Sequence, residues 1–148
     1  MKRLGYIIFA IGGLLLFAFA GQIGRYVGKS GVQSYEAGKM QGLVEKGQEL
    51  AAVELRKQLP LQVDKLTTLQ TVVSAGKMLI YRYEIATKKT EVDIGGFVSE
   101  MTEILKNNTC QQKQMRASMN MNAKYKYMYF DTDGLLLADI TISSADCV

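Results

Sequence analysis

The sequence predicts an α+β domain: an antiparallel sheet of about four strands with helices on one face, preceded by an N-terminal transmembrane or signal helix. Two stretches that alternate apolar and polar residues predict pairs of strands, and a stripe of helical period lies between them. An uncharged apolar run opens the chain. The 148 residues therefore divide into a membrane anchor or signal segment (1–24), a glycine-rich helical seam or linker (25–43) and one domain (44–148).

The N-terminal segment has two interpretations. Met1-Lys2-Arg3 is positively charged, and residues 4–20 (LGYIIFAIGGLLLFAFA) carry no charge. As a helix this run is about 26 Å long, and continuing it to Gly24 makes it long enough to span a hydrocarbon core. Ala18-Phe19-Ala20 is also a small-x-small signal for cleavage after Ala20. The chain is therefore expected at the inner membrane facing the periplasm, or in the periplasm if it is cleaved.

Glycines recur after this segment with a period near 3.5 residues. Gly21, Gly24, Gly28 and Gly31 begin a series that continues at 38 and 42. On a helix they would form a seam of small residues that lets a second helix approach closely, which predicts helix packing and a homo-oligomer. The alternative is a flexible linker in which the spacing is accidental.

Helices are predicted over 44–59, 93–106 and 110–119. Pro60 ends the first helix, whose apolar residues are Leu43, Leu50, Val53 and Leu55. The second carries one apolar stripe and is expected to stop at Asn107-Asn108. The stripe consists of Ile94, Phe97, Val98, Met101, Ile104 and Leu105.

Strands are predicted over 66–73 and 77–87 around a turn at 74–76, with a further strand if 61–63 pairs. The alternation puts Leu79, Tyr81, Tyr83 and Ile85 on one face.

A second hairpin is predicted from 123–130 and 135–143 around Asp131-Thr132-Asp133-Gly134. A four-residue loop would pair Tyr129 with Leu136 and Tyr127 with Ala138, and it would place Lys126 opposite Asp139. The loop lacks the further carboxylates of a calcium site, so turn chemistry is the better interpretation.

Cys110 and Cys147 are the two cysteines of the chain. In an exported domain they predict one disulfide, which would stabilise the fold by roughly 4 kcal/mol through loop closure.

Tyrosines are concentrated on the predicted strands: Tyr81, Tyr83, Tyr125, Tyr127 and Tyr129. They either pack under the helical stripe or form a surface for a partner protein, since tyrosine favours interfaces.

Several function classes are excluded. The chain has no histidine, which removes the common nucleophile triads and most catalytic zinc sites. Gly28-Lys29-Ser30 lacks the upstream glycine of a phosphate-binding loop, because position 23 is isoleucine. The net charge of +4 is spread along the chain, so nucleic-acid binding is not expected. No cofactor, metal site or enzyme activity is predicted.

Short motifs over about the last 90 residues resemble those of small, uncharacterised exported or membrane-anchored proteins of bacteria. They are Leu59-Pro60 with Val63-Asp64, Tyr81-Arg82-Tyr83, Cys110, Met115-Arg116, Tyr127-x-Tyr129 with Asp131, and Asp146-Cys147. The resemblance implies an exported α+β domain and no activity.

The sequence thus predicts a non-catalytic extracytoplasmic binding or assembly module anchored to the inner membrane, with an unidentified protein partner. The alternative is a periplasmic inhibitor or immunity-type protein that blocks a toxin or hydrolase.

Overall fold

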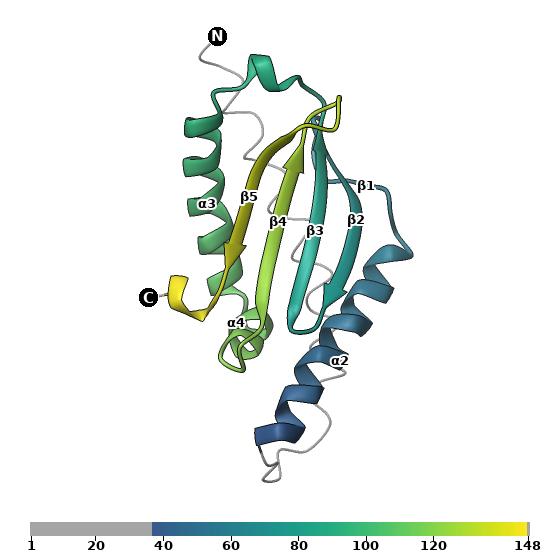
Figure 1. The fold of residues 1–148 in the computed structure, drawn as a ribbon, viewed down its shortest axis with the longest axis vertical. Coiled ribbons are helices and arrows are strands. Elements are labelled where there is room, and N and C mark those ends of the chain that lie inside the picture. Colours follow the sequence, from purple (N-terminus) through teal and green to yellow (C-terminus); the bar gives the residue numbers. More distant parts are fainter. Residues whose placement is uncertain (1–36, 148) are drawn as a thin grey trace.

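The computed structural model describes residues 37–147, which form one sheet with three α-helices (Figure 1). The predicted anchor (1–24), Gly21 to Gly31 of the predicted seam and most of segment 25–43 lie outside these residues. No helix within 37–147 is both long and apolar enough to cross a membrane. The elements are α2 (Ala37–Arg56), β1 (Leu61–Gln62), β2 (Thr67–Ala75), β3 (Met78–Ile85), α3 (Ile94–Gln111), α4 (Lys113–Met119), β4 (Lys124–Phe130) and β5 (Leu136–Ile142), with 3-10 turns at Lys89–Glu91 and Ser144–Asp146.

The sheet is mixed and has five strands in the order β1-β2-β3-β4-β5. β1, β2 and β3 are antiparallel, as are β4 and β5, but β3 and β4 run parallel. The prediction of about four antiparallel strands is therefore wrong at the centre of the sheet. The connection from β3 to β4 carries α3 and α4, and such a helical crossover returns the chain to the end where β3 began, which makes the two strands parallel.

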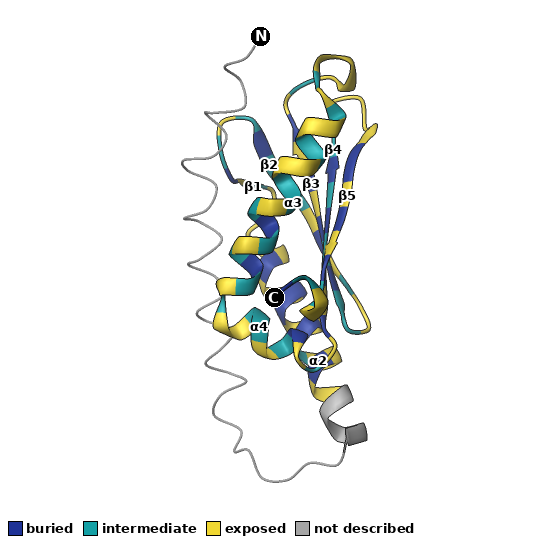
Figure 2. Ribbon diagram, turned by 90° about the vertical axis from the view of Figure 1, so that its left-hand side faces the viewer, coloured by how far each residue is buried: buried dark blue, intermediate teal, exposed yellow. Residues whose placement is uncertain are grey.

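All three helices lie on the same side of the sheet, as predicted (Figure 2). α2 packs on β2 and β3, and α3 packs on β5. Tyr125 of β4 lies beside both Gln48 of α2 and Ser118 of α4, which places these two helices over the same face. The predicted inner face of β3 is confirmed, because its four side chains are buried: Leu79, Tyr81, Tyr83 and Ile85.

Helix α2 turns a different face to the core from the one predicted. The predicted apolar residues Leu43, Leu50 and Val53 are exposed, and of that set only Leu55 is buried. The buried residues are Val44, Gln48, Ala51, Ala52 and Leu55. Small side chains let α2 approach the sheet closely. The buried face of α2 therefore has few large apolar residues, and the sequence pattern does not identify it as the core face.

Helix α3 continues past the predicted stop at Asn107-Asn108 and ends at Gln111. The predicted stripe faces the core, where Ile94, Phe97, Val98 and Met101 pack against the buried cluster and Leu105 belongs to it. The last turn adds Thr109, whose hydroxyl meets that of Tyr127. Tertiary contacts of this turn thus outweigh the weak helical propensity of the two asparagines.

The β4–β5 hairpin forms where it was predicted, with a shifted register. Tyr127 pairs with Ile140 and Tyr129 with Ala138, two residues further along β5 than expected. The loop is one residue shorter than predicted, because Asp131 pairs with Leu135. A bulge near Tyr129 adds the second residue of the shift. An even shift leaves the same tyrosines facing the core.

Candidate protein-binding surfaces

The five strand tyrosines are core residues, so their interpretation as a partner surface is wrong. Each is between 2% and 8% exposed. Tyr81 stacks on Tyr127 with ring centroids 5.1 Å apart, and Tyr83 stacks on Tyr129 at 4.9 Å. Phe97 of α3 closes this cluster edge-on against Tyr129 at 5.5 Å. The alternation of β3 and β4 puts all five rings on the side that the helices cover.

Burial determines the hydrogen bonding and the pKa of the tyrosine hydroxyls. The Tyr127 hydroxyl lies 2.9 Å from that of Thr109, and the Tyr125 hydroxyl 2.6 Å from that of Ser118. Burial raises the pKa of all five tyrosines. For Tyr125 the hydrogen bonds to Ser118 and Gln48 oppose this rise in pKa. The five tyrosine hydroxyls are therefore neutral near pH 7 and do not serve as nucleophiles or bases.

The predicted disulfide is confirmed. Cys110 at the end of α3 is bonded to Cys147 after β5, with the Cα atoms 5.4 Å apart. The bond joins the last turn of α3 to the chain that leaves the last strand. The position of β5 relative to α3 is therefore fixed covalently at this end.

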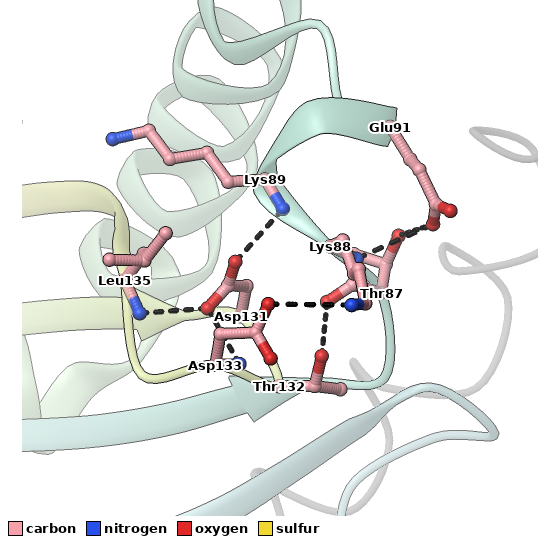
Figure 3. A network of polar contacts seen from close by, with 8 residues as sticks. All are labelled: Thr87, Lys88, Lys89, Glu91, Asp131, Thr132, Asp133 and Leu135. Atoms are coloured by element: carbon pink, nitrogen blue, oxygen red, sulfur yellow. Dashed lines mark hydrogen bonds and ion pairs between the residues drawn. The ribbon is translucent and has the colours of Figure 1, made fainter.

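A network of polar contacts closes the opposite end of the sheet (Figure 3). Asp131, which is 1% exposed, accepts backbone N–H bonds from Asp133 and Leu135 in its own loop at 2.9 and 2.7 Å. Its second carboxylate oxygen accepts the N–H of Lys89, at 2.9 Å, from the loop that leads to α3. Burial opposes ionisation of this carboxyl, but the backbone donors outweigh it and lower its pKa. One carboxylate thus holds the two loops together.

This network supports turn chemistry for the loop. Asp131 engages backbone N–H groups with both oxygens, and Asp133 faces Lys88 at 3.6 Å on the exposed surface. Among the residues described, no three metal-binding side chains come together.

The face of the sheet away from the helices carries several apolar side chains. They come from alternate positions on four strands: Val73, Ile80, Met128, Phe130 and Leu136. Val73 and Leu136 are 38% and 41% exposed. The Arg82 guanidinium lies 3.9 Å above the ring of Phe130, and Lys126 pairs with Asp139 at 2.9 Å. We call this surface the open face; on it apolar and charged side chains alternate, since Arg82 and Asp139 flank Met128 and Lys126 stands beside Ile80.

A second exposed apolar row lies on α2, where Leu43, Gly47 and Leu50 share one side of the helix. Leu43 and Leu50 are 53% and 51% exposed. No atom lies within 4 Å of a Cβ built on Gly47. Val53, one turn after Leu50, is 38% exposed, so α2 carries three exposed large apolar side chains.

Sequence reasoning did not single out the open face. The alternation of β3 and β4 predicts the tyrosine side, and Met128 and Phe130 occupy the intervening positions of β4. A strand with large apolar residues at both odd and even positions indicates apolar surface on both faces. This signal was available from the sequence alone.

The described residues define a class of small α+β domains with a mixed sheet and helices on one face. No protein-family model matches the chain, and no curated protein matches its sequence.

Three solved structures share the fold. The pilotin EpsS of the Vibrio vulnificus type 2 secretion system is 17% identical and aligns over 75% of this chain and 97% of its own, with a TM-score of 0.63. The type II secretion pilotin AspS of Vibrio cholerae is 17% identical over 74% of this chain and 97% of its own, with a TM-score of 0.60. A Pseudomonas aeruginosa protein described as a predicted secreted protein is 15% identical over 74% and 96%, with a TM-score of 0.65. At these identities the likeness shows a common fold.

Proposed function

We propose that this chain is a non-catalytic, extracytoplasmic protein-binding module of an envelope assembly, held at the inner membrane by residues 1–24. The observation that carries the proposal is the open face. The helices cover one side of the sheet, and the other side retains apolar side chains from four strands. Apolar side chains gathered on one face of a sheet are a common feature of protein-binding sites.

Two further observations support the proposal. The fold is shared with two proteins described as pilotins of type II secretion systems. The disulfide between Cys110 and Cys147 favours an oxidising compartment, where such bonds persist. The tyrosine hydroxyls are buried, and the Asp131 carboxylate is fully used in holding two loops, so neither supplies a catalytic group.

The test is affinity capture of the full-length chain from detergent-solubilised envelope, with mass spectrometry of the captured proteins and of the mature N-terminus. A double variant of the open face, Val73→Lys with Leu136→Lys, should abolish capture because it puts two charges into the contact with the partner. Leu50→Lys on α2 is the control: it adds a charge at a more exposed leucine and should leave capture unchanged.

Two outcomes would contradict the proposal. Capture that survives the double substitution would remove the open face as the binding surface. A chain cleaved after Ala20 that co-purifies as a monomer with one hydrolase would favour the inhibitor or immunity-type alternative.

A further inference from the structure

The outer edge of β5 is a strand edge that the described residues leave unpaired. β5 has seven residues and closes the order β1-β2-β3-β4-β5. Figure 2 looks onto this edge, and no described element lies in front of it. At the opposite side of the sheet, β1 covers the beginning of β2. An edge strand presents backbone N–H and C=O groups that another strand can pair with.

The hydrogen bonds around β4 identify which backbone groups of β5 are free. Lys124 donates its N–H to the Lys77 carbonyl, on the β3 side, at 3.0 Å. Asp131 donates its N–H to the Leu135 carbonyl, on the β5 side, at 2.9 Å. Even-numbered residues of β4 therefore bond toward β3, and odd-numbered residues bond toward β5.

The same alternation extends to β5. Its residues opposite Tyr125 and Tyr127 are Ile142 and Ile140, which bond inward. Asp139 and Thr141 stand opposite even-numbered residues, so their N–H and C=O groups point away from the sheet. The next outward N–H belongs to Ser143 and is already bonded to the Asp146 carboxylate at 2.8 Å. The free edge is thus limited to two residues with two donors and two acceptors.

Between Ala138 and Ile142 this edge carries neither lysine nor proline, two of the features that prevent strand pairing. Natural edges are protected by lysine, proline, short length or a bulge. Between Ala138 and Ile142 the sequence is Ala-Asp-Ile-Thr-Ile, and its one charge, Asp139, is paired with Lys126. The bulge near Tyr129 lies before this stretch. The disulfide and the bond from Ser143 to Asp146 fix the far end, so little conformational entropy remains to be lost on pairing.

Helix α3 determines what can pair here. Figure 1 shows α3 behind the sheet and beyond the β5 edge, so that it overhangs the place where a sixth strand would lie. An added strand would extend the sheet beneath this helix. A second copy of the domain paired through its own β5 would bring its α3 to the same place, where the two helices would collide.

We propose that the β5 edge accepts an extended segment of the partner protein as a sixth strand. This inference rests on the proposed function and specifies the mode of binding. The segment pairs with Asp139 and Thr141 through up to four backbone hydrogen bonds and presents an apolar residue beside Ile140, on the side of α3. The residues next to it point to the open face, where hydroxyl or basic side chains suit the Asp139 carboxylate.

The probe is a fluorescent peptide that copies residues 138–143 with lysines at both ends, added to the full-length chain in detergent. In an antiparallel register centred on Ile140, it places a threonine opposite Asp139 and an isoleucine beside Ile140. Two backbone-methylated forms provide the test. The first form is methylated on the backbone nitrogens that copy Ile140 and Ile142, which point away from β5. The second form is methylated on the nitrogens that copy Asp139 and Thr141, which face β5 and would donate hydrogen bonds to it.

We expect the first form to bind and the second to bind about tenfold to a hundredfold more weakly, since it loses two hydrogen bonds. Hydrogen exchange should slow at Asp139 and Thr141 with the first form only. Equal binding of the two forms, absence of binding by the first form, or protection at another surface would overturn the proposal. If the chain without peptide forms a dimer through β5, the edge binds a second copy of the chain and not a segment of a partner protein, which would overturn the proposal.

A protein variant separates this inference from the proposed function. Thr141→Pro removes one outward N–H and leaves the ladder to β4 intact. It should lose both the peptide and the captured partner, and Leu50→Lys should keep both. If Thr141→Pro captures the same partner as the unmodified chain, strand addition is wrong and the proposed function stands. If the unmodified chain captures no envelope protein, the proposed function fails and the peptides still decide the edge.

Discussion

Two tyrosines of the core differ in one respect that stability measurements can resolve. The Tyr127 hydroxyl has a partner in Thr109, at 2.9 Å, and both side chains are buried. The Tyr83 hydroxyl is also buried, but no group among the described residues accepts or donates a hydrogen bond to it. Replacing each by phenylalanine removes the same atom from the same cluster. The two variants therefore isolate the effect of the hydrogen bond.

The expected effects have opposite signs. Tyr127→Phe removes a hydrogen bond and leaves the Thr109 hydroxyl buried without its partner, which costs about 1–2 kcal/mol of the free energy of unfolding. Tyr83→Phe removes a buried hydroxyl that has no hydrogen-bond partner among the described residues, so it should stabilise by about 1 kcal/mol. The gap of about 2–3 kcal/mol corresponds to roughly 10 °C in Tm for a domain of this size.

Urea unfolding of the disulfide-bonded protein at pH 7, followed by far-ultraviolet circular dichroism, measures both variants against the unmodified chain. The slope with denaturant should stay the same, so that differences in midpoint report stability directly. Equal losses in the two variants would refute the reasoning, because they would show that the Tyr83 hydroxyl has a hydrogen-bond partner as good as Thr109.

Three further predictions follow from the same structure. Replacing Cys110 and Cys147 by alanine should lower the free energy of unfolding by about 4 kcal/mol through loop closure over their separation of 37 residues, measured by urea unfolding; an unchanged midpoint would contradict it. Because burial raises the pKa of the five core tyrosines, the stability that they contribute is present below about pH 10 and is lost as the pH rises further. In a chain whose other three tyrosines, Tyr6, Tyr26 and Tyr35, are replaced by phenylalanine, absorbance at about 295 nm should therefore report tyrosinate only together with unfolding. Titration of all five before unfolding would show that they are accessible to water. The lowered pKa of Asp131 gives stability that is present above its unfolded pKa of about 4 and is lost as the pH falls through the folded value. Asp131→Asn should therefore be less stable than the unmodified chain at pH 7 and equally stable in acid, below both pKa values. A difference in stability that persists in acid would assign the effect to packing.

The strands and their inner faces were predictable because alternation is a local signal. Tyr81 and Tyr83 share a face for any sheet in which β3 takes part, and the turn at Gly76 needs only the left-handed backbone that glycine adopts, here with φ of 57°. The pairing of Cys110 with Cys147 needed no geometry, since the chain has two cysteines.

The parallel neighbours β3 and β4 were not predictable from such signals. Their contact depends on how α3 and α4 cross the sheet, which no residue of either strand encodes alone. The register of β5 failed for a related reason: the bulge and the shorter loop leave the alternation of each strand unchanged and alter only their relative position.

The open face and the β5 edge were missed because both are defined by what the other described residues leave uncovered. Val73 and Leu136 are far apart in the sequence and belong to one surface only because β2, β3, β4 and β5 pair in that order. Asp139 and Thr141 have unpaired backbone groups because β5 is the last strand of the sheet that residues 37–147 form. Sequence patterns report the kinds of side chain along the chain, and whether a backbone group is paired does not change those patterns.

The central claim is that this chain binds an envelope protein outside the cytoplasm. Photo-crosslinking in intact cells tests it most directly, with a crosslinking amino acid at position 73 on the open face and, as control, at position 50 on α2. The account predicts one specific crosslinked protein from position 73, none from position 50, and an oxidised Cys110–Cys147 pair in the crosslinked material. Free thiols in a chain recovered from the cytosol, or the same crosslinks from both positions, would contradict it.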